Sequence, residues 1–161
     1  MTEPSTEPIT EPVALPPLLE RPSFLVHRIN ALMMRACNPY FQQWGVDLVM
    51  SRMMVVILEE GPIPAGRIVE VMALPQSTIS HQIKRLEKLG YVKREQGKED
   101  SRMVIASLTA KGRKVATKAN HLSRQVRDRL MEAIGEDDYD TVRLALMRAD
   151  DALRSFQPSS G

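Results

Sequence analysis

The chain has 161 residues and a formal net charge of +2, which suits one domain and excludes a polycation whose whole surface binds nucleic acid. Its single cysteine excludes a disulfide framework within the chain, and no paired cysteines stand at zinc-ligand spacing. No stretch has the length and apolarity of a membrane span, and the N-terminus lacks a basic-then-apolar signal, so we expect a cytoplasmic protein that does not enter a membrane.

Residues 1–22 differ in composition from the rest, with the repeat TEP-STEP-ITEP, prolines throughout and no basic residue before Arg21. Such a segment has too little apolar surface to offset the entropy lost on ordering, so we predict a disordered tail. Residues 23–157 are then expected to form a single domain, and residues 158–161 a flexible C-terminus.

The domain is predicted to begin with two helices. Residues 23–41 carry apolar side chains at helical spacing, and Pro39 should kink or end this helix. A second helix, about 47–60, is apolar nearly all round in its run LVMSRMMVVIL, and a helix without a polar face belongs in the centre of a fold. A segment with glycine and proline follows and leads to a short helix at about 65–73.

The next predicted helix, residues 75–89, has both ends marked, because Pro75 suits the first turn and Gly90 suits the left-handed position past the end. Its core-facing stripe consists of Ile79, Ile83 and Leu86. Its other surface carries Ser77, Thr78, Ser80, His81, Lys84, Arg85 and Lys88. Hydroxyls and free backbone N–H groups at a helix start can hold phosphate, and the longer donors can reach base edges in a major groove. The alternative is an ordinary solvated face.

A hairpin is predicted directly after this helix. YVKRE and RMVIASL alternate well enough to pair as strands, and GKED supplies a turn that contains glycine. The basic residues of the hairpin are Lys93, Arg94, Lys98 and Arg102. The pattern of residues 47–108 therefore predicts a winged helix-turn-helix. In this motif one surface, formed by the helix and the wing, could contact a groove and the backbone of DNA together.

The run from Leu74 to Thr109, with LPQSTISHQIKRLEKLGYVKR, then DSR and SLTAKG, closely resembles the winged helix of MarR-type bacterial transcription regulators. In that family the helix led by STxS enters the major groove, and the wing's Asp-x-Arg directs its arginine to the minor groove while the aspartate steadies it. Asp100 and Arg102 match this motif. The resemblance is motif-dense over residues 74–113 and extends in element order over about 23–156.

The resemblance implies a sequence-specific, homodimeric regulator of double-stranded DNA with a palindromic operator, usually a repressor that a small ligand releases. The residues expected to contact DNA are Ser77, Thr78, Ser80, His81, Lys84, Arg85, Lys88, Arg94, Lys98, Asp100 and Arg102. The acidic tail then has two interpretations, a solubilising segment or one whose carboxylates weaken DNA binding by repelling phosphate.

Two longer helices are predicted after the wing, with Thr109 as the N-cap of the first. The second carries an apolar stripe in unbroken 3/4 alternation, which is typical of packed helices. This stripe consists of Tyr139, Val142, Leu146, Ala149, Leu153 and Phe156. Because the family places its N- and C-terminal helices in a dimer interface, we expect residues 23–43 and 109–157 to dimerise; packing on the same chain is the alternative. The expected fold is mainly α with a small β-hairpin wing.

The resemblance also implies a small effector. Members of the family commonly bind small, often aromatic or acidic, ligands in a cleft between the dimer helices and the winged-helix lobe. The candidate residues for this cleft are His27, Met34, Arg35, Trp44, Met53 and Met54. Methionine adapts its shape to apolar guests, but it also fills gaps in cores. We expect no cofactor and no metal.

Other functions fit the sequence less well. A thiol sensor would use Cys37, but only Arg35 stands near enough in sequence to activate it. A metal sensor would need His27, His121, Cys37 or Asp47 to converge, and no two have a ligand-pair spacing. An enzyme is not expected, because no phosphate loop, nucleophile elbow or HExxH motif occurs. A winged helix used only to bind proteins would not need basic residues on both helix and wing.

Overall fold

The computed structural model describes residues 14–97 and 102–158. These residues form one 3-10 helix, six α-helices and a three-stranded antiparallel sheet. In chain order the elements are η1 (Leu18–Glu20), α1 (Pro22–Gln42), α2 (Leu48–Glu60), β1 (Ile63–Pro64), α3 (Ala65–Met72), α4 (Gln76–Lys88), β2 (Val92–Gln96), β3 (Val104–Leu108), α5 (Ala110–Ile134) and α6 (Glu136–Arg154). The predicted class, mainly α with a small β wing, is confirmed.

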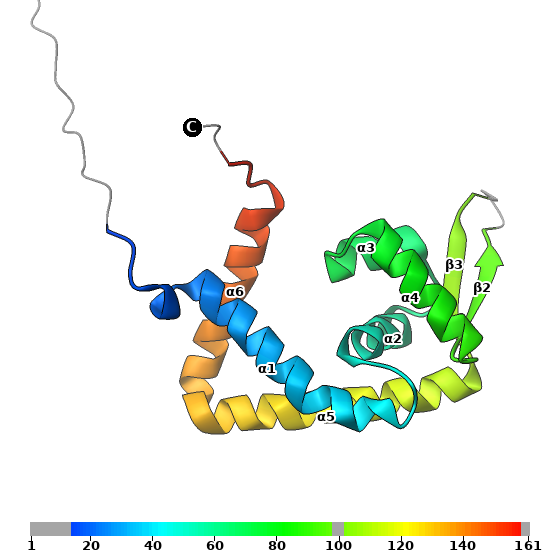
Figure 1. Ribbon diagram of the computed structural model, residues 1–161, viewed down its shortest axis with the longest axis horizontal. Coiled ribbons are helices and arrows are strands. Elements are labelled where there is room, and N and C mark those ends of the chain that lie inside the picture. Colours follow the sequence, from blue (N-terminus) through cyan, green and yellow to red (C-terminus); the bar gives the residue numbers. More distant parts are fainter. Residues whose placement is uncertain (1–13, 98–101, 159–161) are drawn as a thin grey trace, which may run out of the picture.

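The elements are arranged as two lobes joined by α5 (Figure 1). One lobe holds α2, α3, α4 and the hairpin of β2 and β3, while α6 and the start of α1 lie at the other end of the molecule. The long helix α5 runs along the base from the end of β3 to the start of α6, and it packs on α2. The winged helix-turn-helix is therefore carried at one end of α5.

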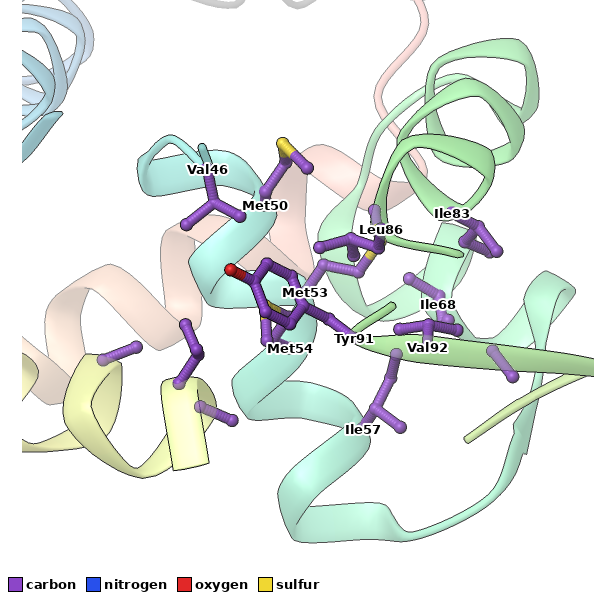
Figure 2. Close-up of a cluster of buried hydrophobic side chains, with 14 of the residues drawn as sticks. Val46, Met50, Met53, Met54, Ile57, Ile68, Ile83, Leu86, Tyr91 and Val92 are labelled. Carbon is purple, nitrogen blue, oxygen red and sulfur yellow. The ribbon is translucent and has the colours of Figure 1, made fainter. Parts of the chain in front are cut away.

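The helix α2 lies in the centre of the winged-helix lobe, as its composition predicted. Met50, Met53 and Met54 are 0% exposed and Ile57 is 2% exposed. Figure 2 shows these side chains packed among others from α3, α4 and the start of β2. The labelled partners from those elements are Ile68, Ile83, Leu86, Tyr91 and Val92. The carboxylate of Asp47 caps α2 by accepting a hydrogen bond of 2.8 Å from the Met50 N–H.

The helix α1 continues through Pro39 to Gln42, so this proline does not end the helix. The other predicted effect of Pro39, a kink, stays a prediction. Proline removes one backbone hydrogen bond from a helix interior. Tertiary contacts hold the last turn in place, because Phe41 is only 1% exposed and the Asn38 side chain accepts a hydrogen bond of 2.9 Å from the Leu48 N–H. The packing of this turn against α2 outweighs the local cost.

The hairpin is confirmed, and a third strand joins it. β2 pairs with β3 from Val92 opposite Leu108 to Gln96 opposite Val104. The unpredicted strand is β1, whose Ile63 pairs with Ala106 on the other edge of β3. A strand of two residues, the second of which is a proline, gives no periodic signal, so only the fold reveals it.

The last two helices differ sharply in burial. Thr109 caps α5 as predicted, since its hydroxyl accepts a hydrogen bond of 3.0 Å from the Gly112 N–H. α5 buries Val115, Ala116 and Ala119, whereas α6, all of which is described, buries no residue. Apart from Tyr139, which is half-buried, the apolar stripe of α6 is therefore left exposed by its own chain.

The N-terminal segment is described only from Ala14 onward. It contains η1, and the Arg21 side chain donates a hydrogen bond of 2.9 Å to the Pro16 carbonyl. Residues 1–13 and 159–161 lie outside the described residues, so the expectation of disordered or flexible ends stays a prediction. In the described chain, no helix combines the length and apolarity needed to cross a membrane.

Candidate nucleic-acid interface

The recognition helix of the predicted winged helix, α4, is oriented by its buried stripe. Ile79 and Leu86 are 0% exposed and Ile83 is 2% exposed, so the opposite face turns outward. On that face Ser77, His81, Lys84, Arg85 and Lys88 are exposed, and Thr78 and Ser80 are half-buried. Gly90 follows the helix at φ +76, the left-handed conformation predicted for it.

A cleft of about 440 Å³ lies between the first half of α4, the start of α3 and the wing. Its cations come from three parts of the chain, with Lys84 on α4, Arg94 on β2 and Arg102 just before β3. Ser80 and Gln76 line the same cleft. The structure thus brings Ser80, Lys84, Arg94 and Arg102 together. It adds Gln76, which was not among the predicted contacts. An amide side chain in the first turn after Pro75 can both donate to and accept from base edges, so the residue type itself could have indicated this contact.

Arg94 is engaged with α4 as well as lining the cleft. Side chains alternate along a strand, so Arg94 shares the inward face of the buried Val92. Its Nη2 and Nε atoms lie 2.6 Å and 2.7 Å from Oε2 of Glu87 near the end of α4. This ion pair fixes the base of the wing against α4. Glu87 was not among the predicted site residues, because its pairing with Arg94 depends on how β2 packs against α4.

Arg85 and Lys88 are not among the residues that line this cleft. Arg85 donates a hydrogen bond of 3.2 Å to the Gln82 side chain, and its Nη1 lies 3.9 Å from a carboxylate oxygen of Asp47 at the start of α2. Both cations stand in the last turn of α4, where positive charge offsets the helix dipole. This position gives them a structural role beside the predicted contact with DNA.

The rest of the wing tip falls outside the described residues, including Lys98 and Asp100. The geometry of the Asp-x-Arg motif therefore stays a prediction, although its arginine, Arg102, is exposed and lines the cleft.

On α3, Arg67 bridges to the end of α2. Its Nε lies 3.1 Å from Oε2 of Glu60, and its Nη1 lies 3.3 Å from Oε2 of Glu70. The hydrogen bond with Glu60, followed by that with Glu70, raises the pKa of Arg67 above its ordinary value. The guanidinium is therefore charged under all ordinary conditions and joins the two helices.

The six residues expected to hold an effector are not gathered into one cleft. Met53 and Met54 are 0% exposed, so in this structure their side chains form part of the core and line no cleft with the other four. Met34 and Trp44 are half-buried, while His27 and Arg35 are exposed on α1. A groove of about 460 Å³ does lie between α1 and α5, but none of the six lines it. Its lining includes Ile29, Leu32, Met33, Cys37, Leu122 and Val126.

Cys37 is 5% exposed at the base of this groove. Within residues 14–97 and 102–158, no group of three or more His, Cys, Asp or Glu side chains is placed to hold a metal ion.

Comparison with known proteins gives one consistent match. The family model described as "MarR family" matches residues 52–104. The HTH-type transcriptional regulator MgrA of Staphylococcus aureus is 26% identical over 89 residues, which are 55% of this chain and 60% of that protein. The chain thus spans less than two thirds of the length of this curated relative.

Two solved structures extend the similarity to the whole fold. AbsC of Streptomyces coelicolor, described as a MarR family transcriptional regulator, is 25% identical with a TM-score of 0.72, covering 83% of this chain and 93% of that one. The MepR–DNA complex of S. aureus is 16% identical with a TM-score of 0.74, covering 81% and 96%. At this lower identity the second comparison shows the fold alone.

Proposed function

Because this chain belongs to the MarR family, we propose that it is a homodimeric transcription regulator that binds double-stranded DNA in a sequence-specific manner. The observation that carries the proposal is the cleft between α4 and the wing, where Lys84, Arg94 and Arg102 converge from three parts of the chain. An outward polar helix beside a basic hairpin has the shape and charge to enter a major groove and follow the adjacent backbone. MepR, which shares the fold, was solved as a complex with DNA.

The contacts with DNA divide into two kinds in this proposal. The hydroxyls of Ser77 and Thr78 and the free N–H groups of the first turn of α4 hold phosphate. His81 and Lys84, about one turn further along the exposed face, reach base edges. Arg102 extends the contact from the wing toward the minor groove.

The dimer is supported by apolar surface that the chain leaves uncovered. On α6, Leu146 is 49% exposed and Leu153 is 68% exposed, and on α1 Ile29 is 46% exposed. Exposed apolar faces of this extent mark interaction surfaces in soluble proteins. A second copy packed on α1 and α6 would present two copies of α4 to half-sites about 34 Å apart, as a palindromic operator requires.

Release by a small ligand completes the proposal. The groove between α1 and α5 is lined mostly by apolar side chains, and Gln125 and Arg129 stand at its edge. An aromatic or apolar guest with one carboxylate suits such a lining. We infer that such a guest shifts α1 relative to α5, changes the spacing of the two wings and so releases a repressor from its operator.

The test is a selection of duplexes from a random pool by the purified full-length protein. The expected result is enrichment of a palindrome whose half-sites are about one helical turn apart. Affinity for the selected duplex should fall steeply as salt rises, because phosphate contacts release counterions. Recovery of no preferred sequence would contradict specific DNA binding, and recovery of a single, unrepeated half-site would contradict the dimer.

A further inference from the structure

A second groove, with cations along one wall, lies on α5. It has a volume of about 380 Å³ and is formed by residues of α1, α2 and α5, with none from α4, β2 or β3. The lining residues that matter here are Tyr40, Leu58, Thr117, Lys118, His121 and Arg124. Lys118, His121 and Arg124 stand three residues apart, so they share one side of α5 on adjoining turns. The groove is therefore separate from the proposed DNA-binding cleft.

The cations of this groove are not neutralised by carboxylates. The sequence contains no Asp or Glu in residues 101–127. Among all residues whose placement is described, no ion pair joins Lys118, His121 or Arg124 to an acidic side chain. Several arginines further along the chain do form ion pairs with acidic side chains. These pairs are Arg127–Asp128, Arg129–Glu132, Arg143–Asp140 and Arg154–Asp150. A recess with unpaired cations has a positive local potential that concentrates anions.

The chain's single tryptophan, Trp44, adjoins the groove. The Nζ atom of Lys118 lies 5.9 Å from the centroid of the Trp44 ring. The same ring meets that of Tyr40 edge-on, with centroids 5.2 Å apart. An anion that binds Lys118 changes the charge next to the indole, so Trp44 is a built-in reporter of occupancy.

We propose that this groove binds a small anion with two or more negative charges, such as a phosphate ester or a di- or tricarboxylate. Lys118 and Arg124 are six residues apart, about 9 Å along the helix axis, so an anion with separated charges can meet both. The side chains of His121, Thr117 and Tyr40 add further hydrogen-bonding groups between and beside them. The volume also falls within the range of small-molecule sites.

A small anion fits this recess better than the backbone of a duplex. Residues of three helices surround the hollow, and Leu58 of α2 contributes an apolar side chain to it. A strand of phosphates needs a ridge or open channel of cations along which it can run. The cations here instead line one hollow of about 380 Å³, so the binding energy would come from a few charge-assisted hydrogen bonds to one guest.

The test titrates the full-length protein with pyrophosphate and, separately, with citrate. Sodium chloride keeps the ionic strength constant, and binding is followed by Trp44 fluorescence and by calorimetry. We expect a saturable change with at least one of the two anions, at a concentration roughly tenfold or more below that required for acetate. A preference for pyrophosphate assigns the site to phosphate esters, and a preference for citrate assigns it to polycarboxylates.

Two double variants that remove the same charge from the same helix give the control. Lys118→Gln with Arg124→Gln should weaken binding in calorimetry by roughly a hundredfold, because both ionic contacts are lost. Arg113 and Lys114 do not line the groove. Replacing both with glutamine should therefore change the affinity for the anion by no more than about threefold.

Equal weakening in both double variants would mean a diffuse charge effect and would overturn the proposal, as would the absence of saturable binding at millimolar anion. A third outcome would also overturn the proposal. If the Lys118→Gln, Arg124→Gln variant lost non-specific binding to duplex DNA, and pyrophosphate did not compete with the duplex for the unaltered protein, the surface would be assigned to DNA. The anion titrations contain no DNA, so their failure and the failure of the proposed regulatory function are distinguishable.

Discussion

The junction between the wing and α5 depends on a few individual residues. Thr109 accepts from the Gly112 N–H and donates a hydrogen bond of 2.7 Å to the Gly90 carbonyl. The first turn of α5 also passes so close to Tyr91 that a Cβ on Gly112 would lie 1.9 Å from the Tyr91 carbonyl oxygen. Lys111 adds a hydrogen bond of 2.9 Å to the Leu89 carbonyl. These contacts fix the direction in which α5 leaves the wing.

Replacing Gly112 with alanine should therefore destabilise the fold. The added methyl group cannot be placed without moving the backbone of Tyr91, and overpacking of this kind costs about 1–3 kcal/mol of unfolding free energy. Gly66→Ala on α3 is the matched control, because a Cβ there meets nothing within 4 Å. Urea unfolding followed by Trp44 fluorescence measures both variants. Equal stability of the two would contradict the close approach of α5 to Tyr91.

Replacing Arg102 tests the proposed function directly. Arg102→Ala should weaken operator binding by about 1–3 kcal/mol, since a guanidinium near a narrow minor groove meets concentrated negative potential. Folding and dimerisation should be unchanged, because the side chain is exposed beside the cleft. Fluorescence anisotropy at moderate salt gives the affinity, with Arg113→Ala as the control, because Arg113 is exposed on α5 and does not line the cleft. Wild-type affinity in the Arg102 variant would exclude the wing contact.

At the scale of elements, α4 and the wing act as one unit. The buried stripe of α4 sets its outward face, and the ion pair between Arg94 and Glu87 ties β2 to the end of α4. Both side chains are about one third exposed, so the pair contributes on the order of 1 kcal/mol or less to stability. Its importance is positional, because it keeps the cations of wing and helix on the same side.

The two kinds of contact proposed for α4 predict different effects of mutation. His81→Ala should relax the preference at one base position in each half-site, because this side chain is assigned to a base edge. Ser77→Ala should lower affinity for all sequences alike, since it is assigned to phosphate. Binding-site selection with each variant separates the two outcomes. If the His81 variant selected the same site as the unaltered protein, the assignment of His81 to base readout would be wrong.

At the scale of the whole molecule, the winged-helix lobe has a packed core and the opposite end has exposed apolar faces. The largest fully buried side chains include Met50, Met53 and Ile57 of α2, whereas α6 leaves Leu146, Leu153 and others uncovered. Burying a leucine contributes about 1.5–3 kcal/mol, so a second copy packed on these faces would be strongly favoured. One lobe thus has a core of its own, and the other presents the apolar faces that the proposed dimer would cover.

The dimer can be tested on α6 without altering any residue proposed to contact DNA. Leu146→Glu with Leu153→Glu should give monomers and abolish operator binding, because charged side chains would be buried in the interface. Leu144→Glu is the control, since it lies on the opposite side of the helix from Leu146. Light scattering coupled to size exclusion gives the mass, and anisotropy gives the affinity. An intact dimer of the double variant, with normal binding to a palindromic site, would place the interface elsewhere.

The sequence alone was enough to predict most elements of the fold. Helical periodicity, the Thr109 cap, the glycine at position 90 and the alternation of the hairpin are local signals, and local geometry decides them. The motifs of the helix and wing were sufficient to identify the family, because their residue types are set by what a DNA-reading surface requires. The polar face of α4 was likewise predicted, since it follows from the position of the buried stripe.

Only the tertiary structure decided the features that depend on residues far apart in the chain. These include the passage of α1 through Pro39 and the pairing of β1 with β3. The ion pair of Glu87 with Arg94 and the cationic groove on α5 belong to the same group. Each results from packing between separate elements, and packing energies can outweigh local preferences without leaving a periodic trace in the sequence.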